Sequence, residues 1–298
     1  MYEDIRKNKW KSGLIVALFV LAITLIVYYV CMAFDLGPVS IGIALLVSIL
    51  SAWGSYYYSD SIVLSVNRAR PATEEEDKKL VNILEGIMVS SGLEHKPRLY
   101  VVEDPQPNAF ATGRNPQNAV ICVTTGLLNK LDYYELEGVL AHELSHIKNY
   151  DIRLSAVVSV MVGFVVMLSD WVTRTLFWFG DDRDNDSKGN AILFLIGLVL
   201  LILAPIFGQL MQLSISRKRE FLADATAVEL TRNPDGLISA LQKLDGDHSQ
   251  MATANNATAH MFIVSPFKSS LDGKKERTSM WSTHPSIDAR IEALRNLK

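Results

Sequence analysis

The chain is poor in cysteine and lacks the charge bias of a nucleic-acid-binding protein. It has 2 cysteines among 298 residues, Cys31 in an apolar run and Cys122 in an expected buried strand. Two such cysteines argue against a disulfide framework, fit a reducing cytoplasm and make poor candidates for metal ligands. The formal net charge is −3, and no basic stripe with interleaved aromatic residues is present, so we do not expect nucleic acid as a partner.

Three long stretches of the sequence lack charged residues, and another is apolar for its first 16 residues. Each stretch is long enough to cross the hydrocarbon core of a bilayer as a helix. The third is the least regular, because its second half carries Asp170 and Arg174, which can pair or lie at the membrane surface. The sequence therefore predicts four transmembrane helices, over Gly13–Phe34, Val39–Tyr58, Leu154–Phe179 and Ala191–Leu213.

Lysine and arginine residues predict the orientation of these four spans. They precede the first span, follow the fourth and are frequent between the second and third. The link 35–38 has no basic residue, and the link 180–190 has four aspartates against Arg183 and Lys188. By the positive-inside rule, both termini and the long middle segment face the cytoplasm. The first apolar run is too long for a signal peptide and no small-residue cleavage site follows it, so we expect it to be retained.

This topology predicts four parts of the chain. Two are membrane hairpins and two are cytoplasmic segments that lie on the same side of the membrane. In chain order they are a hairpin (1–58), a cytoplasmic segment (59–153), a second hairpin (154–213) and a second cytoplasmic segment (214–298).

Residues 141–147 contain the pattern H-E-x-x-H, formed by His142, Glu143 and His146. The segment Leu131–Lys148 has no proline and places apolar residues at three- and four-residue steps, which predicts a helix. Two histidines four residues apart lie on one face of such a helix, where they can bind one zinc ion together. Glu143 points to the side and can reach a metal-bound water. The alternative is a pair of core histidines held by hydrogen bonds, and the glutamate between them favours the metal.

A catalytic zinc usually has three protein ligands and one open position, so a third ligand is needed. No later histidine follows His146 at the short spacing of the H-E-x-x-H-x-x-G-x-x-H class. The best candidate is Glu220, in a predicted helix over Glu220–Leu230 that carries Asp224 on the same face. A carboxylate one turn after the ligand can accept the spare N–H of a zinc-bound histidine. The alternative is a solvated acidic face beside basic residues.

The remaining polar segments predict a small sheet beside several helices. Thr73 and Glu76 form a capping-box pattern before a helix that Gly92 ends. An extended peptide can add to the edge of a sheet as an extra strand, and the alternative is a strand that is covered and purely structural. The candidate edge is Asn108, Ala109, Phe110 and Ala111. Strands are predicted over 98–103, 108–112 and 119–124, and helices over 73–91, from about 125, and over 237–244 and 287–297.

Five segments together resemble the HtpX family of membrane-bound zinc endopeptidases of bacteria and, more distantly, the prenyl-protein (CAAX) endopeptidases of the endoplasmic reticulum. The segments are 108–113, 141–147, 219–224, 259–263 and 283–286. The resemblance implies an α+β membrane protein with four transmembrane helices and a cytoplasmic thermolysin-like (gluzincin) peptidase domain, with one Zn²⁺ per chain.

The resemblance also implies roles for individual residues. Glu220 would be the third zinc ligand, beside His142 and His146, and Asp224 would orient His142. His284, with Arg290 on the following helix, would stabilise the oxyanion. From its sequence context alone, His284 is a lone histidine typical of a surface or capping position, and so is His260.

The implied activity is hydrolysis of peptide bonds in misfolded or damaged membrane proteins at the cytoplasmic face of the bacterial plasma membrane, as quality control under stress. Its partners would be peptide and membrane-protein substrates and the lipid bilayer. One alternative is CAAX-type processing of lipid-modified peptides, which needs a lipid-sized chamber for which four spans are few. Another is a non-catalytic membrane scaffold with a structural zinc, but such sites usually have four cysteine-rich ligands.

Overall fold

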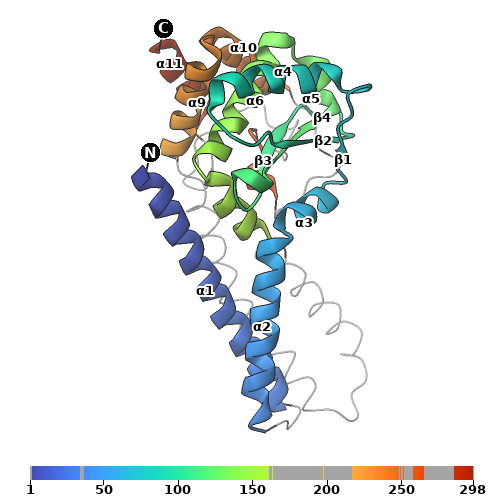
Figure 1. Ribbon diagram of the computed structural model, residues 1–298, viewed down its shortest axis with the longest axis vertical. Coiled ribbons are helices and arrows are strands. Elements are labelled where there is room, and N and C mark those ends of the chain that lie inside the picture. The colour runs from blue at the N-terminus through green and yellow to red at the C-terminus, as the bar shows by residue number, and fades with distance from the viewer. Residues whose placement is uncertain are drawn as a thin grey trace.

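The computed structural model describes residues 2–33, 37–160, 163, 197, 217–247, 249, 251, 258–264 and 285–297. Figure 1 shows a helical hairpin that extends from one end of a mixed domain of helices and a small sheet. The hairpin consists of α1 (Tyr2–Ala33) and α2 (Val39–Tyr57), which pack side by side. Inside it, the hydroxyl groups of Thr24 and Ser48 lie 2.7 Å apart.

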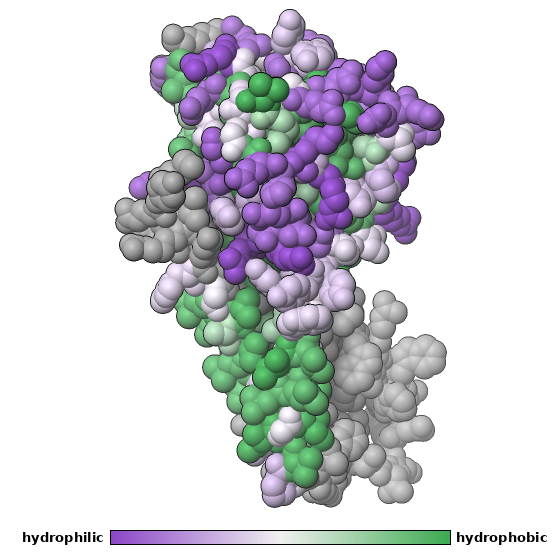
Figure 2. All heavy atoms as spheres, in the orientation of Figure 1, coloured by the Kyte–Doolittle hydropathy of each residue, from purple (hydrophilic) through white to green (hydrophobic). Residues whose placement is uncertain are grey.

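The hairpin carries most of the exposed large apolar residues among those that the structure describes. Figure 2 shows hydrophobic residues gathered along it and hydrophilic residues over the domain above it. Among the described residues, one helix, Val39–Tyr57, is both long enough and apolar enough to cross a membrane. A shorter apolar stretch, Val16–Tyr28, lies within α1. The predicted third and fourth spans lie mostly outside the described residues, so the prediction of four spans is not confirmed.

The sheet has four strands in the order β1-β2-β4-β3. The central pair, β2 and β4, is parallel, while β1 and β3 run antiparallel to their neighbours at the two edges. Three strands were predicted within about a residue, but β1 was not, because a two-residue strand that contains a proline leaves no alternating pattern to detect. The strands are β1 (Arg70–Pro71), β2 (Arg98–Val102), β3 (Ala109–Thr112) and β4 (Val120–Thr124).

Helices surround this sheet, and most agree with the sequence-based prediction. They are α3 (Ser59–Val66), which was not predicted, α4 (Lys78–Ser91), α5 (Thr125–Lys130), α6 (Tyr133–Lys148), α9 (Arg217–Thr231), α10 (Pro234–Asp245) and α11 (Ile287–Arg295). The described residues also form a helical segment over 151–160 and two 3₁₀ turns, Pro116–Asn118 and Ala259–Met261.

The predicted start of α4 at Thr73 is wrong. The Thr73 hydroxyl does accept a hydrogen bond from the Glu76 amide, at 3.2 Å. However, the Asp77 carboxylate accepts from the Thr73 amide at 3.0 Å and from Arg70 at 2.8 Å, so residues 73–77 close into a turn and the helix begins only at Lys78. The end of the helix was predicted correctly, since Gly92 has a left-handed φ of 68°.

Helix α6 is the central element of the domain, with α4, α9 and α10 packed around it and β3 and β4 beside it. Its first turn is fixed by a capping box between Asp132 and Glu135. Glu135 also accepts hydrogen bonds from Ser239 and Lys243 of α10, at 2.5 and 2.6 Å. This anchoring sets the rotation of α6 and therefore the direction in which its histidines point.

Candidate active site

Helix α6 brings the two histidines of the H-E-x-x-H pattern together. Their Nε2 atoms lie 3.2 Å apart, and the ring planes are nearly perpendicular, at 89°. His142 is buried and His146 is half-buried. Because the residues are one helical turn apart, the two nitrogens face the same point in space.

Helix α9 brings a carboxylate to that point. Glu220 is 4% exposed, and its oxygens lie 3.7 Å from His142 Nε2 and 3.5 Å from His146 Nε2. Each of the three side chains offers one ligand atom, and these atoms lie within 4.8 Å of one another. Ligand atoms about 3.3 Å apart are expected around a tetrahedral zinc with bonds of about 2.0 Å, so two imidazoles and one carboxylate fit this metal.

Asp224 lies behind His142, one turn after Glu220. Its Oδ1 is 2.9 Å from His142 Nδ1, and both side chains are buried. A carboxylate at this nitrogen accepts the ring N–H and leaves the lone pair on Nε2, where the metal would bind. Burial, together with the charge of Arg290, lowers the pKa of His142 and favours the neutral ring that a metal ligand needs.

Arg290 of α11 holds Asp224 in place. Its Nε and Nη2 donate to the two oxygens of Asp224, at 2.9 and 2.6 Å, and its Nη1 lies 3.7 Å from Glu220 Oε2. Burial raises the pKa of Asp224, but the Arg290 charge outweighs this and holds the pKa below its usual value. Two of the guanidinium N–H groups are thus engaged by Asp224, which favours a positioning role for Arg290.

A second carboxylate lies behind His146 and was not predicted from the sequence. Asp151 Oδ2 is 3.1 Å from His146 Nδ1, and Asp151 Oδ1 is 3.0 Å from Arg219 Nη1. Burial lowers the pKa of His146, but the Asp151 hydrogen bond and the Glu220 charge outweigh it and raise the pKa to about 9. Unlike His142, this ring therefore favours the protonated form, and a metal that binds its Nε2 would displace a proton. A spacing of five residues gives no signal, because on an unbroken helix residues 146 and 151 would not share a face.

The sequence profile of peptidase family M48 matches residues 74–298, which include the whole cluster. The chain belongs to peptidase family M48. It is a metalloprotease. The family implies a metal that is normally zinc, and the scaffold alternative is set aside.

Relatives of this M48 peptidase cover its full length. A Protease HtpX homolog of Dictyoglomus turgidum is 42% identical over 99% of this chain and 94% of its own. A second Protease HtpX homolog, of Caldanaerobacter subterraneus subsp. tengcongensis, is 43% identical over 100% of this chain and 98% of its own. The crystal structure of S. mikatae Ste24p aligns with 99% of this chain and 66% of its own, at 20% identity and a TM-score of 0.48. The family match and the two HtpX relatives show that the chain is a membrane-associated zinc metalloprotease of the HtpX type, and the predicted resemblance to this family is confirmed.

The other predicted site residues of the M48 peptidase fall in different places. Glu143 is 2% exposed on α6, between the two histidines, and its charge contributes to the raised pKa of His146. His284 lies outside the described residues, so its expected place near the oxyanion is not tested. His260 is buried, with its Nε2 3.4 Å from Ser159 Oγ, rather than at the surface.

The predicted edge strand β3 does lie at an edge of the sheet, but half of it is covered. Ile263 donates its amide to the Ala109 carbonyl at 3.0 Å. The Asn108 side chain pairs with the backbone of Val264, donating at 3.0 Å and accepting at 3.3 Å. Backbone groups alternate along a strand, so Ala111 is the next residue whose amide and carbonyl face the outer edge. Among the described residues, no backbone group forms a hydrogen bond with Ala111 at this outer edge.

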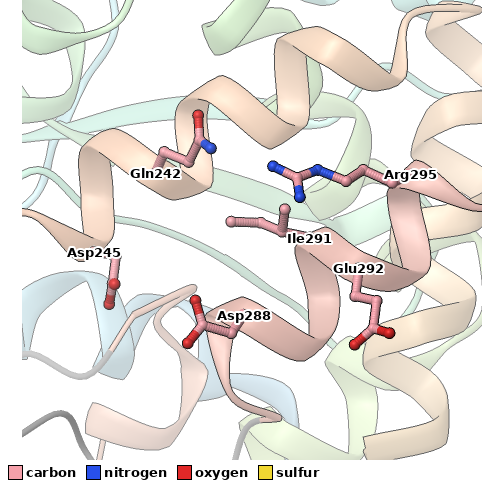
Figure 3. Close-up of a pocket in the computed structure, with 6 residues that line it drawn as sticks. All are labelled: Gln242, Asp245, Asp288, Ile291, Glu292 and Arg295. Carbon is pink, nitrogen blue, oxygen red and sulfur yellow. The ribbon is translucent and has the colours of Figure 1, made fainter.

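A cavity of about 510 Å³ lies between α10 and α11, away from the histidine cluster. Figure 3 shows acidic groups of both helices and the Arg295 guanidinium around it. Arg290 lies on the opposite side of α11 by helical geometry. The cavity is lined by Gln242, Asp245, Asp288, Ile291, Glu292 and Arg295.

Proposed function

We propose that this M48 peptidase holds one zinc ion through His142, His146 and Glu220 and hydrolyses peptide bonds of membrane proteins. The observation that supports this most directly is the convergence of two Nε2 atoms and one buried carboxylate at a single point. When bound, zinc supplies a water of lowered pKa and a positive charge that polarises the scissile carbonyl.

Glu143 acts in this proposal as the general base and acid. It accepts the proton of the attacking water and delivers it to the leaving amine, as expected for the glutamate of an H-E-x-x-H helix. Asp224 keeps His142 in the tautomer with its proton on Nδ1. His284 is proposed to stabilise the developing oxyanion, while the contacts of Arg290 with Asp224 support a role in holding that carboxylate.

The substrate is proposed to bind as an extended peptide along the outer edge of β3. Ile263 and Val264 already pair with Ala109 and Asn108, so the proposed docking position is narrowed to Ala111. Strand addition of this kind binds through the peptide backbone and therefore tolerates many sequences. Such tolerance suits a peptidase that acts on damaged proteins rather than on one defined sequence.

We further propose that the chain has four spans, with both termini and the active site in the bacterial cytoplasm, and that it removes misfolded or damaged membrane proteins under stress. The distribution of basic residues supports this orientation. The α1–α2 hairpin supports the first two spans. Bacterial relatives named Protease HtpX homolog support the bacterial plasma membrane as the location.

The activity is tested with full-length protein purified in detergent. Glu143→Gln should keep its zinc and lose casein hydrolysis by about 10²- to 10⁴-fold, the usual contribution of a general base. Glu137→Gln, a partly buried glutamate on the same helix, is the matched control and should stay active. His142→Ala and Glu220→Ala should lose the metal itself in elemental analysis. Full activity in Glu143→Gln would contradict the assignment.

The topology and substrate class need separate experiments. Ser187→Cys, in the link 180–190, should react with an impermeant thiol reagent in intact cells, whereas Ser61→Cys on the exposed side of α3 should not. The reverse pattern would overturn the proposed orientation. Cleavage of a prenylated C-terminal peptide together with failure to cleave casein would favour CAAX-type processing over quality control.

A further inference from the structure

Each histidine of the proposed zinc site is backed by its own aspartate–arginine pair. His142 contacts Asp224, which Arg290 holds, as described above. His146 contacts Asp151 at 3.1 Å, and Asp151 contacts Arg219 at 3.0 Å. The first pair is buried, with both side chains at most 2% exposed, whereas Asp151 is 7% and Arg219 is 14% exposed.

A break in the chain after α6 makes the second pair possible. Helix α6 ends at Lys148, and Tyr150 adopts a left-handed φ of 60° before a new helical segment, 151–160, begins. This conformation is uncommon for a residue with a side chain, so the surrounding contacts must maintain it. The left-handed turn at Tyr150 places Asp151 beside His146, whereas on an unbroken helix the two side chains would lie on different faces.

Arg219 reaches the same carboxylate from α9, the helix that also carries Glu220. Two neighbouring residues of α9 thus face opposite ends of the His146 ring. Glu220 faces Nε2 directly, whereas Arg219 contacts the carboxylate that lies behind Nδ1. An ordinary surface ion pair would leave Asp151 exposed and free to rotate. Here each carboxylate oxygen has a different partner, and the group is almost fully buried.

We propose that Asp151 and Arg219 are positioning residues for His146, an inference that rests on the proposed zinc site. Asp151 accepts the Nδ1 proton of His146 and fixes the Nε2 lone pair in the direction of the metal. Arg219 binds the other oxygen and holds the carboxylate at the angle that this hydrogen bond needs. Losing such a partner of a ligand histidine typically weakens metal binding by about 10- to 100-fold.

The test is a zinc titration of the full-length, metal-stripped protein in detergent, against a chromophoric chelator. Asp151→Ala should weaken zinc binding by about 10- to 100-fold. Asp151→Asn, which keeps the shape and one acceptor oxygen, should fold normally and bind zinc with intermediate affinity. Arg219→Gln should have a smaller effect than Asp151→Ala, because the contact between Asp151 and His146 remains.

Asp60→Ala is the matched control, because Asp60 also pairs with an arginine, Arg98 at 2.5 Å, but on α3 and away from the histidines. Its zinc affinity should equal that of the wild type. The visible spectrum of the cobalt-loaded protein gives a second readout, since a displaced His146 changes the ligand field whereas a loss of global stability does not. The spectrum should change in Asp151→Ala and stay unchanged in Asp60→Ala.

The possible outcomes separate this inference from the proposed function. Wild-type zinc affinity and an unchanged cobalt spectrum in Asp151→Ala, while His146→Ala loses the metal, would overturn the positioning role and leave the zinc site intact. Equal weakening in Asp60→Ala would also overturn it, because the effect would then be one of stability. A wild-type protein that binds no zinc would overturn both proposals.

Discussion

Asp224 and Arg290 form a two-point ion pair behind His142, with distances of 2.9 and 2.6 Å and both side chains at most 2% exposed. The pair connects α9 to α11, and its aspartate reaches α6 through His142. A buried ion pair of this kind does not by itself make a protein stable, because both charges have lost their hydration. Removing one partner is costly, because the other charge is then left buried alone.

The first prediction follows from this pair. Arg290→Met should lower the free energy of unfolding by about 3–5 kcal/mol, the usual cost of leaving one buried charge unpaired. Arg295→Met, an exposed arginine on the same helix, should change it little. The double variant Asp224→Asn with Arg290→Met should recover part of the loss. Chemical denaturation in detergent measures all three, and equal effects of the two single arginine variants would contradict the prediction.

A second prediction concerns Gly138, one turn before His142 on α6. A Cβ atom there would lie 2.9 Å from the backbone nitrogen of Leu237, so α6 and α10 pack too closely for a side chain. Gly138→Ala should therefore destabilise the protein by about 1–3 kcal/mol. Gly86→Ala, on α4 with nothing within 4 Å, should stabilise it by about 0.5–1 kcal/mol. Thermal melting of both variants tests these opposite signs.

A third prediction concerns the pH dependence of stability through Glu135. Burial raises the pKa of Glu135, but hydrogen bonds from Lys243 and Ser239 outweigh it and hold the pKa below its usual value. A carboxyl group with a lowered folded pKa contributes stability above its unfolded pKa of about 4.3 and loses this contribution as the pH falls through the folded pKa. Glu135→Gln should cost about 1–2 kcal/mol at pH 7, and the difference should shrink below about pH 4.

Glu137→Gln is the control for this pH dependence. Burial raises the pKa of Glu137, so its charge weakens folding above the folded pKa instead of supporting it. The variant should be at least as stable as the wild type at pH 7. Denaturation curves from pH 7 down to about pH 3.5 compare both variants with the wild type, and parallel pH profiles for all three would rule out the assigned role of Glu135.

A fourth prediction concerns the segment that covers β3. Asn108→Ala removes both hydrogen bonds to the Val264 backbone, which should cost about 1–3 kcal/mol. Amide hydrogen exchange at Ile263 and Val264 should accelerate as the segment separates from the strand. Asn129→Ala, at an exposed position of α5, should leave both measurements unchanged. If the exchange rates stay at wild-type values, another contact must hold the segment.

Local patterns explain what the sequence could predict. Helix α6 has an N-cap, an apolar repeat and the histidine pair within one short window, so its extent and functional face were predictable from neighbouring residues. A spacing of four residues predicted that Glu220 and Asp224 share one face of a helix. Their roles at the metal came from the family resemblance, because a solvated acidic face has the same spacing. The three main strands were predicted for a similar reason, since alternation of side chains is visible within five residues.

Long-range contacts and breaks in the helices explain what the sequence could not predict. The start of α4 depends on a contact between Arg70 and Asp77 that overrides the Thr73 cap. The covered half of β3 depends on Val264, which is 156 positions from Asn108. Asp151 reaches His146 only because Tyr150 is left-handed, which no spacing rule anticipates.

The distance in sequence between His146 and Glu220, 74 positions, has a thermodynamic consequence. A metal ion bound to both residues is a removable cross-link that closes a loop of this size. Loop-closure entropy sets an upper limit of about 4 kcal/mol on the resulting stabilisation, and insertion of the intervening segment into a bilayer would reduce it. Metal-loaded chains would then resist degradation better than metal-free chains, so zinc supply would set the lifetime of the enzyme as well as its activity.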